Sequence, residues 1–202
     1  MKLCFDINEF QGVKFVGGTH GASINEFFKK LSEIFGSMKL HIVPFTIIQQ
    51  TIKEQIPENY SMTTTRRFML RITDEIRKKQ EALAIITGDN LGQVASQTLE
   101  SMYAINEVTN TPILRPLLTM DKNDIIKIAK DIDTYDISIR PFEDCCTIFV
   151  PSSPKTKPKR EKVQHYESFH DFDSLIQEAV QNTETLTIKP DSKQTPEFDD
   201  LF

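Results

Sequence analysis

A short apolar run in the middle of the chain, followed by a glycine turn, constrains the fold more than any other stretch. The run has the sequence ALAII over residues 82–86, without alternation of polar and apolar residues. A strand so short and so uniformly apolar is typical of a parallel sheet covered on both faces. TGDNLG then interrupts the run, and apolar residues return at helical spacing at Val94 or Ala95, Leu99 and Met102. The stretch predicts strand, turn and helix.

A strand, glycine turn and helix can place bare backbone amides and a helix N-terminus beside a ligand, at the carboxyl end of a sheet. The same layout also occurs as an ordinary connection between a strand and a helix. Taken alone, residues 82–103 favour the ordinary connection, so a binding role depends on the rest of the chain.

The other segments alternate between helix and strand. The predicted strands cover 13–16, 40–43 and 111–118, and the predicted helices cover 24–35, 46–56, about 65–79, about 122–132 and about 173–181. Gly36 ends the first helix, Asp121 or Thr119 caps the fourth, and residues 57–60 form a loop. Ile125, Ile128 or Ala129, and Ile132 are expected to face inward on the fourth helix. Such alternation is the pattern of an α/β sheet.

Composition limits the class of protein. The chain has 202 residues and a net charge of −5, which argues against a surface coated in base for non-specific nucleic-acid binding but allows a local basic patch. No apolar run approaches the roughly 20 residues of a membrane helix, and the N-terminus does not read as a signal peptide. Three cysteines are unlike a secreted disulfide framework. We expect a cytoplasmic protein that does not span a membrane.

The adjacent cysteines Cys145 and Cys146 are the first candidates for chemistry. A thiol near Arg140 and the downstream lysines could act as a sulfur nucleophile, although Glu143 and Asp144 oppose thiolate formation. The alternative is that both cysteines are small buried hydrophobic residues. No other cysteine or histidine lies nearby at ligand spacing, so no metal site is predicted.

Basic residues are the second set of candidates. Arg66 and Arg67 at the start of a predicted helix can hold a phosphate, or can belong to a solvated helix face. Lys122 lies in the first turn of a predicted helix, where the dipole favours an acid, and this indicates an anionic ligand. The run Lys155, Lys157, Lys159, Arg160 and Lys162 is either a solvated tail or a contact with an RNA backbone.

Three longer motifs carry a resemblance: ITGDNLGQVASQTLESM, then ILRPLLTMDKNDIIKIAKDIDTYDISIRPFEDCC, then TKPK. With TTTRRFMLRI, they resemble the tRNA 4-thiouridine synthase (tRNA sulfurtransferase) family, in the form without a rhodanese domain. The resemblance runs from about Lys39 to the C-terminus. It implies an α/β fold with a Rossmann-like parallel sheet of the PP-loop (adenine nucleotide alpha hydrolase-like) type.

The resemblance also implies the chemistry. ATP, expected with Mg²⁺, adenylates the carbonyl oxygen of a uridine in tRNA, and a cysteine persulfide loaded by a cysteine desulfurase then delivers sulfur to the activated carbon. The same relay serves synthesis of the thiamine thiazole, so a thiazole-pathway sulfur-carrier protein is a further expected partner. Arg66, Gly88 and Gln97 match nucleotide-binding positions, Lys122 matches a catalytic lysine, and Cys146 falls on the persulfide-bearing cysteine.

The chain departs from the family at its beginning. Complete members carry a ferredoxin-like region and a THUMP domain, and open the catalytic domain with a Ser-Gly-Gly-x-Asp-Ser phosphate loop; none of these is present. In an ungapped alignment, which we favour, Phe10 and Phe15 follow the family's second strand, and the sheet lacks its first strand. Alternatively, VGGTHG at 16–21 is an eroded phosphate loop.

We therefore expect a divergent part at 1–38, the C-terminal portion of the PP-loop sulfurtransferase domain at 39–189, and a flexible acidic tail at 190–202. A separate chain can supply the missing N-terminal domains. Two functions remain open. The chain is part of an enzyme for ATP-dependent sulfur transfer to tRNA, or it is a degenerate sulfur-carrier or desulfurase-binding module that cannot adenylate.

Overall fold

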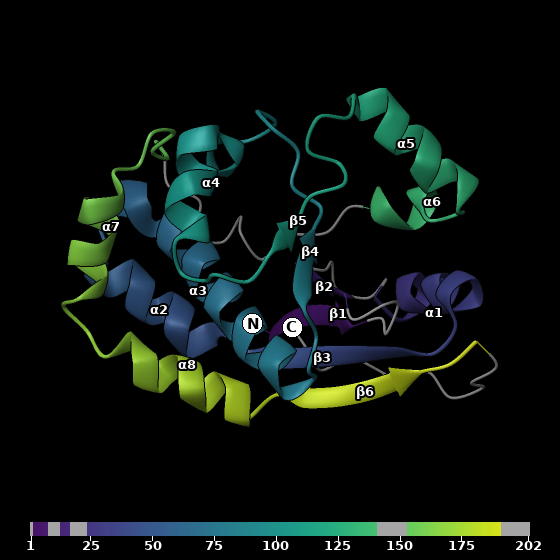
Figure 1. The fold of residues 1–202 in the computed structure, drawn as a ribbon, viewed down its shortest axis with the longest axis horizontal. Helices are drawn as coiled ribbons and strands as arrows, with labels where there is room; N and C mark the ends of the chain where they lie inside the picture. Colours follow the sequence, from purple (N-terminus) through teal and green to yellow (C-terminus); the bar gives the residue numbers. More distant parts are fainter. Residues whose placement is uncertain (1, 8–12, 17–23, 141–152, 191–202) are drawn as a thin grey trace.

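A parallel three-stranded sheet lies at the centre of the molecule (Figure 1). The computed structural model describes residues 2–7, 13–16, 24–140 and 153–190. In this sheet β4 (Ala84–Thr87) lies between β2 (Val13–Val16) and β5 (Ile113–Leu114), and all three strands are parallel. The predicted strand within 82–86 is thus confirmed as the central strand. The predicted strand at 111–118 is reduced to two residues.

A second sheet has the order β1-β3-β6, with both neighbours antiparallel to β3. Its strands are β1 (Lys2–Ile7), β3 (Met38–Pro44) and β6 (Glu184–Ile188). The predicted strand at 40–43 is confirmed as part of β3, but among the described residues it pairs outside the parallel sheet. The prediction of one parallel sheet therefore holds for β2, β4 and β5 alone. Strands β1 and β6 were not predicted.

Helices surround the two sheets, with α2, α3, α7 and α8 on one side of Figure 1 and α1, α5 and α6 on the other. Their bounds are α1 (Ile24–Phe35), α2 (Thr46–Gln55), α3 (Glu58–Lys79), α4 (Leu99–Asn106), α5 (Lys122–Asp131), α6 (Tyr135–Ser138), α7 (Arg160–Glu167) and α8 (Phe172–Gln181). A 3₁₀ turn, η2 (Ala95–Gln97), precedes α4. No described helix has the length and apolar character needed to cross a membrane.

Helix α3 organises the larger core. Phe68, Ile72 and Ile76 lie fully or almost fully buried along one face of α3, as their helical spacing requires. Phe172 and Ile176 of α8 belong to the same cluster, and the ring centroids of Phe68 and Phe172 are 4.5 Å apart. Burying each such side chain contributes about 2 kcal/mol, so this core holds α3 firmly against α8.

Helix α3 begins seven residues earlier than predicted, so the loop expected at 57–60 is wrong. Pro57 is the N-cap of α3 with φ −52°, an angle suited to entering a helix, and Tyr60 is buried in the core. Arg66 and Arg67 therefore do not begin a helix. They lie well inside α3, where the dipole of a helix N-terminus does not act on them.

The inward faces predicted for two helices are partly wrong. Met102 is buried and Ala95, the alternative to Val94, is half-buried, but Val94 and Leu99 are 55% and 64% exposed. The reason is that α4 begins only at Leu99, after η2, with Thr98 as its cap. Helix α5 is capped by Asp121 as predicted, yet none of its residues is buried, so its apolar side chains are only partly covered.

Candidate functional site

The turn after β4 forms the centre of the site. Gly88, Asp89 and Asn90 follow the carboxyl end of β4, and the Leu91 amide donates to the Leu118 carbonyl at 2.9 Å. A side-chain carbon at Gly88 would meet no atom of the described residues within 4 Å, so these residues leave the surface above this glycine open. Gly92 has φ +81°, a left-handed conformation that glycine adopts without strain. The backbone of this turn is therefore exposed to a ligand at the edge where parallel sheets bind them.

Asp89 is the electrostatic centre of the turn and is 5% exposed. Its carboxylate accepts hydrogen bonds from Thr87 Oγ1 at 2.7 Å and Arg115 Nε at 3.0 Å, and forms an ion pair with Arg66. Burial raises the pKa of this carboxyl, but Arg66 and these hydrogen bonds outweigh burial and hold the pKa below its usual range. Two guanidinium groups share one carboxylate, which leaves a net positive charge suited to an anion.

Arg66 connects α3 to the far side of the turn. Its Nη1 donates to Ser96 Oγ at 3.1 Å while its Nη2 pairs with Asp89. Ser96 is the neighbour of Gln97 in η2, and the Gln97 carbonyl closes the turn by accepting from the Gly92 amide at 2.9 Å. The structure thus brings together Arg66, Gly88 and Gln97, the three predicted nucleotide-binding residues.

The side-chain oxygen of Gln97 indicates that a ligand binds at the turn. Oε1 is buried and has no hydrogen-bond partner in the part of the chain that the structure describes. Buried polar atoms are nearly always paired, because an unpaired one costs about 1–3 kcal/mol. This oxygen is available to accept a hydrogen bond from a molecule bound at the turn.

Lys122 follows a segment that is tied to the same turn. Asn90 Nδ2 donates to the carbonyls of Leu117 and Met120, at 2.7 and 2.8 Å, and so holds this segment beside Gly88. Asp121 then caps α5 by accepting from the Asn123 amide at 2.8 Å. Lys122 is exposed at the first position of α5, and no ion pair links its side chain to another described residue.

Cys146, predicted to carry the persulfide, lies outside the described residues, as does Cys145. Their roles stay predictions. The VGGTHG alternative also stays open, because residues 17–23 are not described. Val16 pairs with Thr87, so the chain leaves β2 at the edge of the sheet that carries the Gly88 turn.

The basic run 155–162 is not a solvated tail. The Lys155 amide donates to the Asn59 carbonyl at 3.0 Å, and Thr98 Oγ1 donates to the Thr156 carbonyl at 2.6 Å. Arg160 then begins α7, which was not predicted. Lys157 pairs with Glu100 at 3.6 Å, while Lys155 and Lys159 are exposed.

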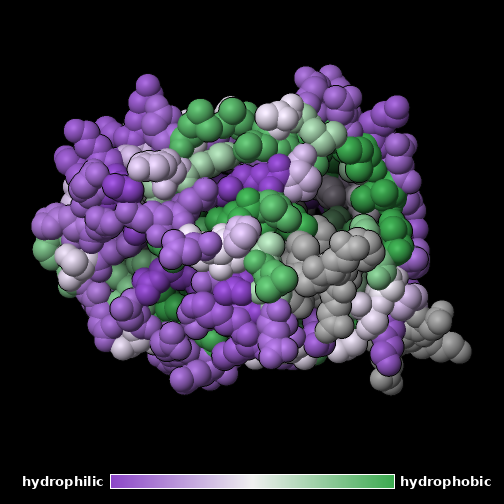
Figure 2. All heavy atoms as spheres, in the orientation of Figure 1, coloured by the Kyte–Doolittle hydropathy of each residue, from purple (hydrophilic) through white to green (hydrophobic). Residues whose placement is uncertain are grey.

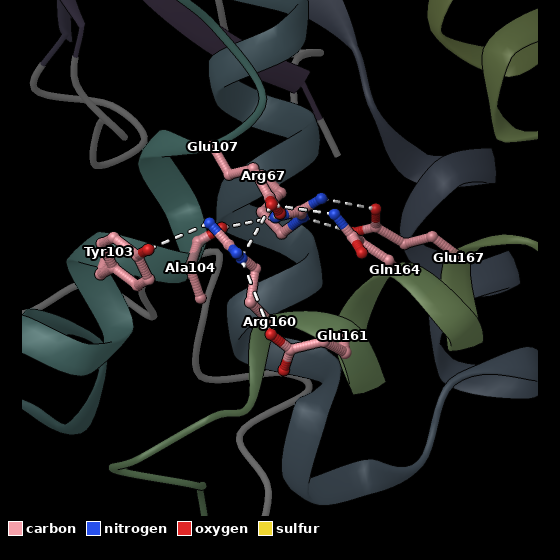
Figure 3. Close-up of polar contacts among 8 residues, drawn as sticks. All are labelled: Arg67, Tyr103, Ala104, Glu107, Arg160, Glu161, Gln164 and Glu167. Atoms are coloured by element: carbon pink, nitrogen blue, oxygen red, sulfur yellow. Dashed lines mark hydrogen bonds and ion pairs between the residues drawn. The ribbon is translucent and has the colours of Figure 1, made fainter.

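Arg67 has a structural role, so neither a phosphate contact nor a solvated helix face describes it. It is 4% exposed and donates to both carboxylate oxygens of Glu167, at 2.7 and 3.1 Å (Figure 3). It also donates to Glu107 at 3.0 Å and to the Ala104 carbonyl. These contacts join α3, α4 and α7 and leave the guanidinium no room for a ligand.

The comparison with protein families gives a decisive match. A family model described as "Thiamine biosynthesis protein (ThiI)" matches residues 7–172. The chain belongs to the ThiI family. A probable tRNA sulfurtransferase of Bacillus licheniformis is 63% identical over 174 residues, covering 86% of this chain and 43% of that protein. One of Bacillus subtilis is 62% identical over 179 residues, covering 89% and 45%.

A solved structure of the same kind confirms the fold. It is described as a crystal structure of a 4-thiouridine synthetase–RNA complex with bound ATP, and it is 36% identical with a TM-score of 0.79. The match covers 88% of this chain and 48% of that one. The likeness supports the predicted α/β fold of the PP-loop type. The chain spans less than half the length of the ThiI relatives it matches.

The site of this ThiI chain contains residues that sequence reasoning did not select: Asn90, Ser96, Asp89 and Arg115. Asp89 was available as a polar residue directly after a buried strand, a position typical of ligand sites in parallel sheets. No local pattern indicates Arg115, because the residue with which it forms a hydrogen bond, Asp89, lies 26 positions earlier in the sequence.

Proposed function

We propose that this chain is the nucleotide- and sulfur-handling part of an ATP-dependent tRNA sulfurtransferase that forms 4-thiouridine. The observation that carries the proposal is the convergence of Arg66, Gly88 and Gln97 at the carboxyl end of β4. The 36% identical relative is a 4-thiouridine synthetase whose structure holds RNA and ATP, which supports the same ligands here.

Each residue has a role in this proposal. The bare backbone at Gly88 admits the nucleotide, Gln97 Oε1 accepts a hydrogen bond from it, and Arg66 supplies positive charge. Mg²⁺ would enter with the phosphates of ATP. Lys122 offsets charge that builds up during adenylation. The terminal sulfur of a persulfide on Cys146 attacks the activated carbon of uridine, and AMP leaves with the former carbonyl oxygen. A thiol then cleaves the S–S bond to Cys146, so that the sulfur stays on the uridine.

The proposed partners follow from this chemistry. A cysteine desulfurase supplies the persulfide sulfur, tRNA receives it in the cytoplasm, and a thiazole-pathway sulfur carrier links the relay to thiamine synthesis. Lys155, Lys157, Lys159 and Arg160 bind the RNA.

Calorimetric titration with Mg-ATP tests the nucleotide site. We expect Arg66→Ala to weaken binding at least 10-fold, because it removes a charge-assisted contact of about 1.5–3 kcal/mol. Arg71→Ala is the matched control, since Arg71 lies on α3 but pairs with Asp173 of α8. Equal affinities for the wild-type chain and Arg66→Ala would contradict the assignment of Arg66.

A second candidate function is a sulfur-carrier or desulfurase-binding module that cannot adenylate. The observation that favours it is that VGGTHG at 16–21, which overlaps the end of β2, lacks the Asp and the flanking serines of the family's phosphate loop. Tight ATP binding, with pyrophosphate released when tRNA is added, rules this candidate out. In that assay Cys146→Ala should still release pyrophosphate but transfer no sulfur, whereas full sulfur transfer by Cys146→Ala would remove Cys146 from the mechanism.

A further inference from the structure

Exposed apolar side chains lie along α4 and the turn before it. Leu91, Val94, Leu99 and Tyr103 are 40%, 55%, 64% and 65% exposed. Leu99 and Tyr103 are four residues apart on α4, so they share one face of the helix. Figure 2 shows apolar atoms gathered over α4 at the upper edge of the molecule. Apolar side chains grouped on a surface in this way mark a site for a partner.

Tyr103 is paired with a cation rather than with another apolar group. The Arg160 guanidinium lies 5.1 Å from the centre of the Tyr103 ring, and its Nη1 donates to the Tyr103 hydroxyl at 3.1 Å (Figure 3). Glu107 holds Arg160 from the other direction at 3.0 Å. A fixed guanidinium over a solvent-exposed aromatic ring gives two flat groups on which a nucleic-acid base can stack.

Lysines flank these flat groups. Thr98, the cap of α4, donates to the Thr156 carbonyl and so holds Lys155 and Lys157 at the start of α4. Within the described ranges, no ion pair joins Lys155 or Lys159 to a carboxylate. The pair of Lys157 with Glu100 is exposed at 3.6 Å and of the kind worth under about 1 kcal/mol, so a phosphate can replace Glu100.

We propose that this surface, formed by Leu99, Tyr103 and Arg160 with Lys155, Lys157 and Lys159, binds an unpaired stretch of RNA. One base stacks on Tyr103 and Arg160, and the lysines contact the neighbouring phosphates. Thr98 directly follows Gln97, so the surface is continuous with the candidate nucleotide site. The inference rests on the proposed function and deepens it, by adding a contact to a nucleotide near the uridine that is modified.

Charge favours RNA over a protein partner as the occupant. Interfaces between proteins are depleted in lysine, whereas a surface that combines exposed aromatic and basic groups suits a polyanion with flat bases. The net charge of the whole chain is −5, so this local group of basic residues stands out against an acidic background.

Fluorescence anisotropy of a labelled single-stranded RNA, titrated with the chain at two salt concentrations, tests the inference. We expect Tyr103→Ala to weaken binding about 5- to 150-fold, the loss that corresponds to one base–aromatic stack, while Tyr103→Phe keeps most of the affinity. Lys159→Ala should weaken binding to all sequences and reduce the salt slope by about 1. Tyr135→Ala is the control, because Tyr135 forms a similar pair with Lys130 at 4.9 Å on α5 and α6.

Intrinsic fluorescence gives an independent measurement. The chain has four tyrosines and no tryptophan, so stacking of a base on Tyr103 should quench part of the tyrosine emission, and Tyr103→Phe should remove that part. Unchanged RNA affinity in Tyr103→Ala, or no RNA binding by the wild-type chain, would overturn the inference. So would a change of oligomeric state in Tyr103→Ala with RNA affinity unaltered, which would make the surface a protein interface.

The same variants separate this inference from the proposed function. Tyr103→Ala should bind Mg-ATP as the wild-type chain does, because Tyr103 makes no contact with Arg66, Asp89 or Gln97 among the hydrogen bonds of the described residues. Loss of RNA affinity with ATP affinity intact supports the surface, and RNA binding that does not respond to Tyr103 removes it while leaving the nucleotide site in place.

Discussion

Arg115 Nε lies 3.0 Å from Asp89 Oδ2 and donates a hydrogen bond to it. Because Asp89 also pairs with Arg66, one buried carboxylate fixes two guanidinium groups that come from distant parts of the chain. Arg115 donates further to Asn106 Oδ1 at 2.6 Å, at the end of α4. The charge of the candidate nucleotide site therefore depends on a residue that need not touch a ligand.

Replacing Asp89 should destabilise the fold in a pH-dependent way. Asp89→Asn leaves two partly buried arginines without their counter-ion, a change expected to cost about 3 kcal/mol at pH 7. Burial raises the Asp89 pKa, but Arg66, Thr87 and Arg115 together hold that pKa below its unfolded value of about 3.9. The stabilisation is thus present above about pH 4 and lost as pH falls through the lower folded-state pKa.

Urea unfolding between pH 7 and pH 2 measures this effect. The difference in unfolding free energy between wild type and Asp89→Asn should shrink as the pH falls below about 4. Glu54→Gln, on the exposed side of α2, is the control for loss of a surface carboxylate. A difference that stays constant down to pH 2 would show that Asp89 does not act through its charge.

Gly88→Ala should separate binding from folding. A methyl group at Gly88 meets no atom within 4 Å in the part of the chain that the structure describes, and Gly88 does not have a left-handed φ, so the thermal unfolding temperature should hardly change. If the nucleotide lies against this backbone, the methyl group collides with it, and Mg-ATP affinity should fall at least 10-fold. If Gly88→Ala binds Mg-ATP with full affinity, the nucleotide does not lie against the backbone of this turn.

Two glycines with the same backbone conformation form a matched pair. Gly92 has φ +81° in the turn, and Gly36 has φ +80° at the end of α1. Either alanine variant should lose about 1 kcal/mol of stability, because a side chain is strained in the left-handed region. Only Gly92→Ala should also weaken Mg-ATP binding, since the Gly92 amide holds Gln97. An equal loss of Mg-ATP affinity in Gly36→Ala would show that affinity falls because the fold is less stable, and not because the turn has changed.

Lys122→Ala should lower the rate of adenylation and leave stability within about 0.5 kcal/mol of wild type. Lys122 is exposed at the N-terminus of α5, where a cation gains nothing from the helix dipole. Loss of a cation that faces developing charge typically lowers the rate about 100-fold or more. The measurement is the rate of pyrophosphate release by Lys122→Ala. Lys127→Ala is the control, because Lys127 is an exposed lysine of the same helix. Equal rates would remove Lys122 from the mechanism.

Local patterns predicted the elements that are determined locally. The apolar run at 82–86, the spacing of Phe68, Ile72 and Ile76, and the cap at Asp121 each depend on neighbouring residues, and each is confirmed. The start of α3 was missed because Pro57 ends one helix and opens the next, a distinction that depends on burial of Tyr60.

Contacts between distant segments could not be predicted in the same way. The second sheet joins 2–7 with 38–44 and 184–188, so both outer strands pair with a strand that lies far away in the sequence. Arg67 and Arg66 are neighbours with similar sequence context, yet Arg67 is sealed among Glu107 and Glu167 while Arg66 reaches the turn. The position of each on the helix circumference relative to α4 and α7 decides this difference.

The side-chain amide of Asn90 gives both of its protons to backbone carbonyls, those of Leu117 and Met120. An aspartate at this position has nearly the same shape, but its carboxylate oxygen would face the two carbonyl oxygens. The hydrogen bonds would then be replaced by electrostatic repulsion. The variant Asn90→Asp would therefore loosen the segment before Lys122, although the backbone bond from Leu91 to Leu118 would still tie it to the Gly88 turn. The position of Lys122 relative to the turn thus depends on the identity of a single side-chain atom.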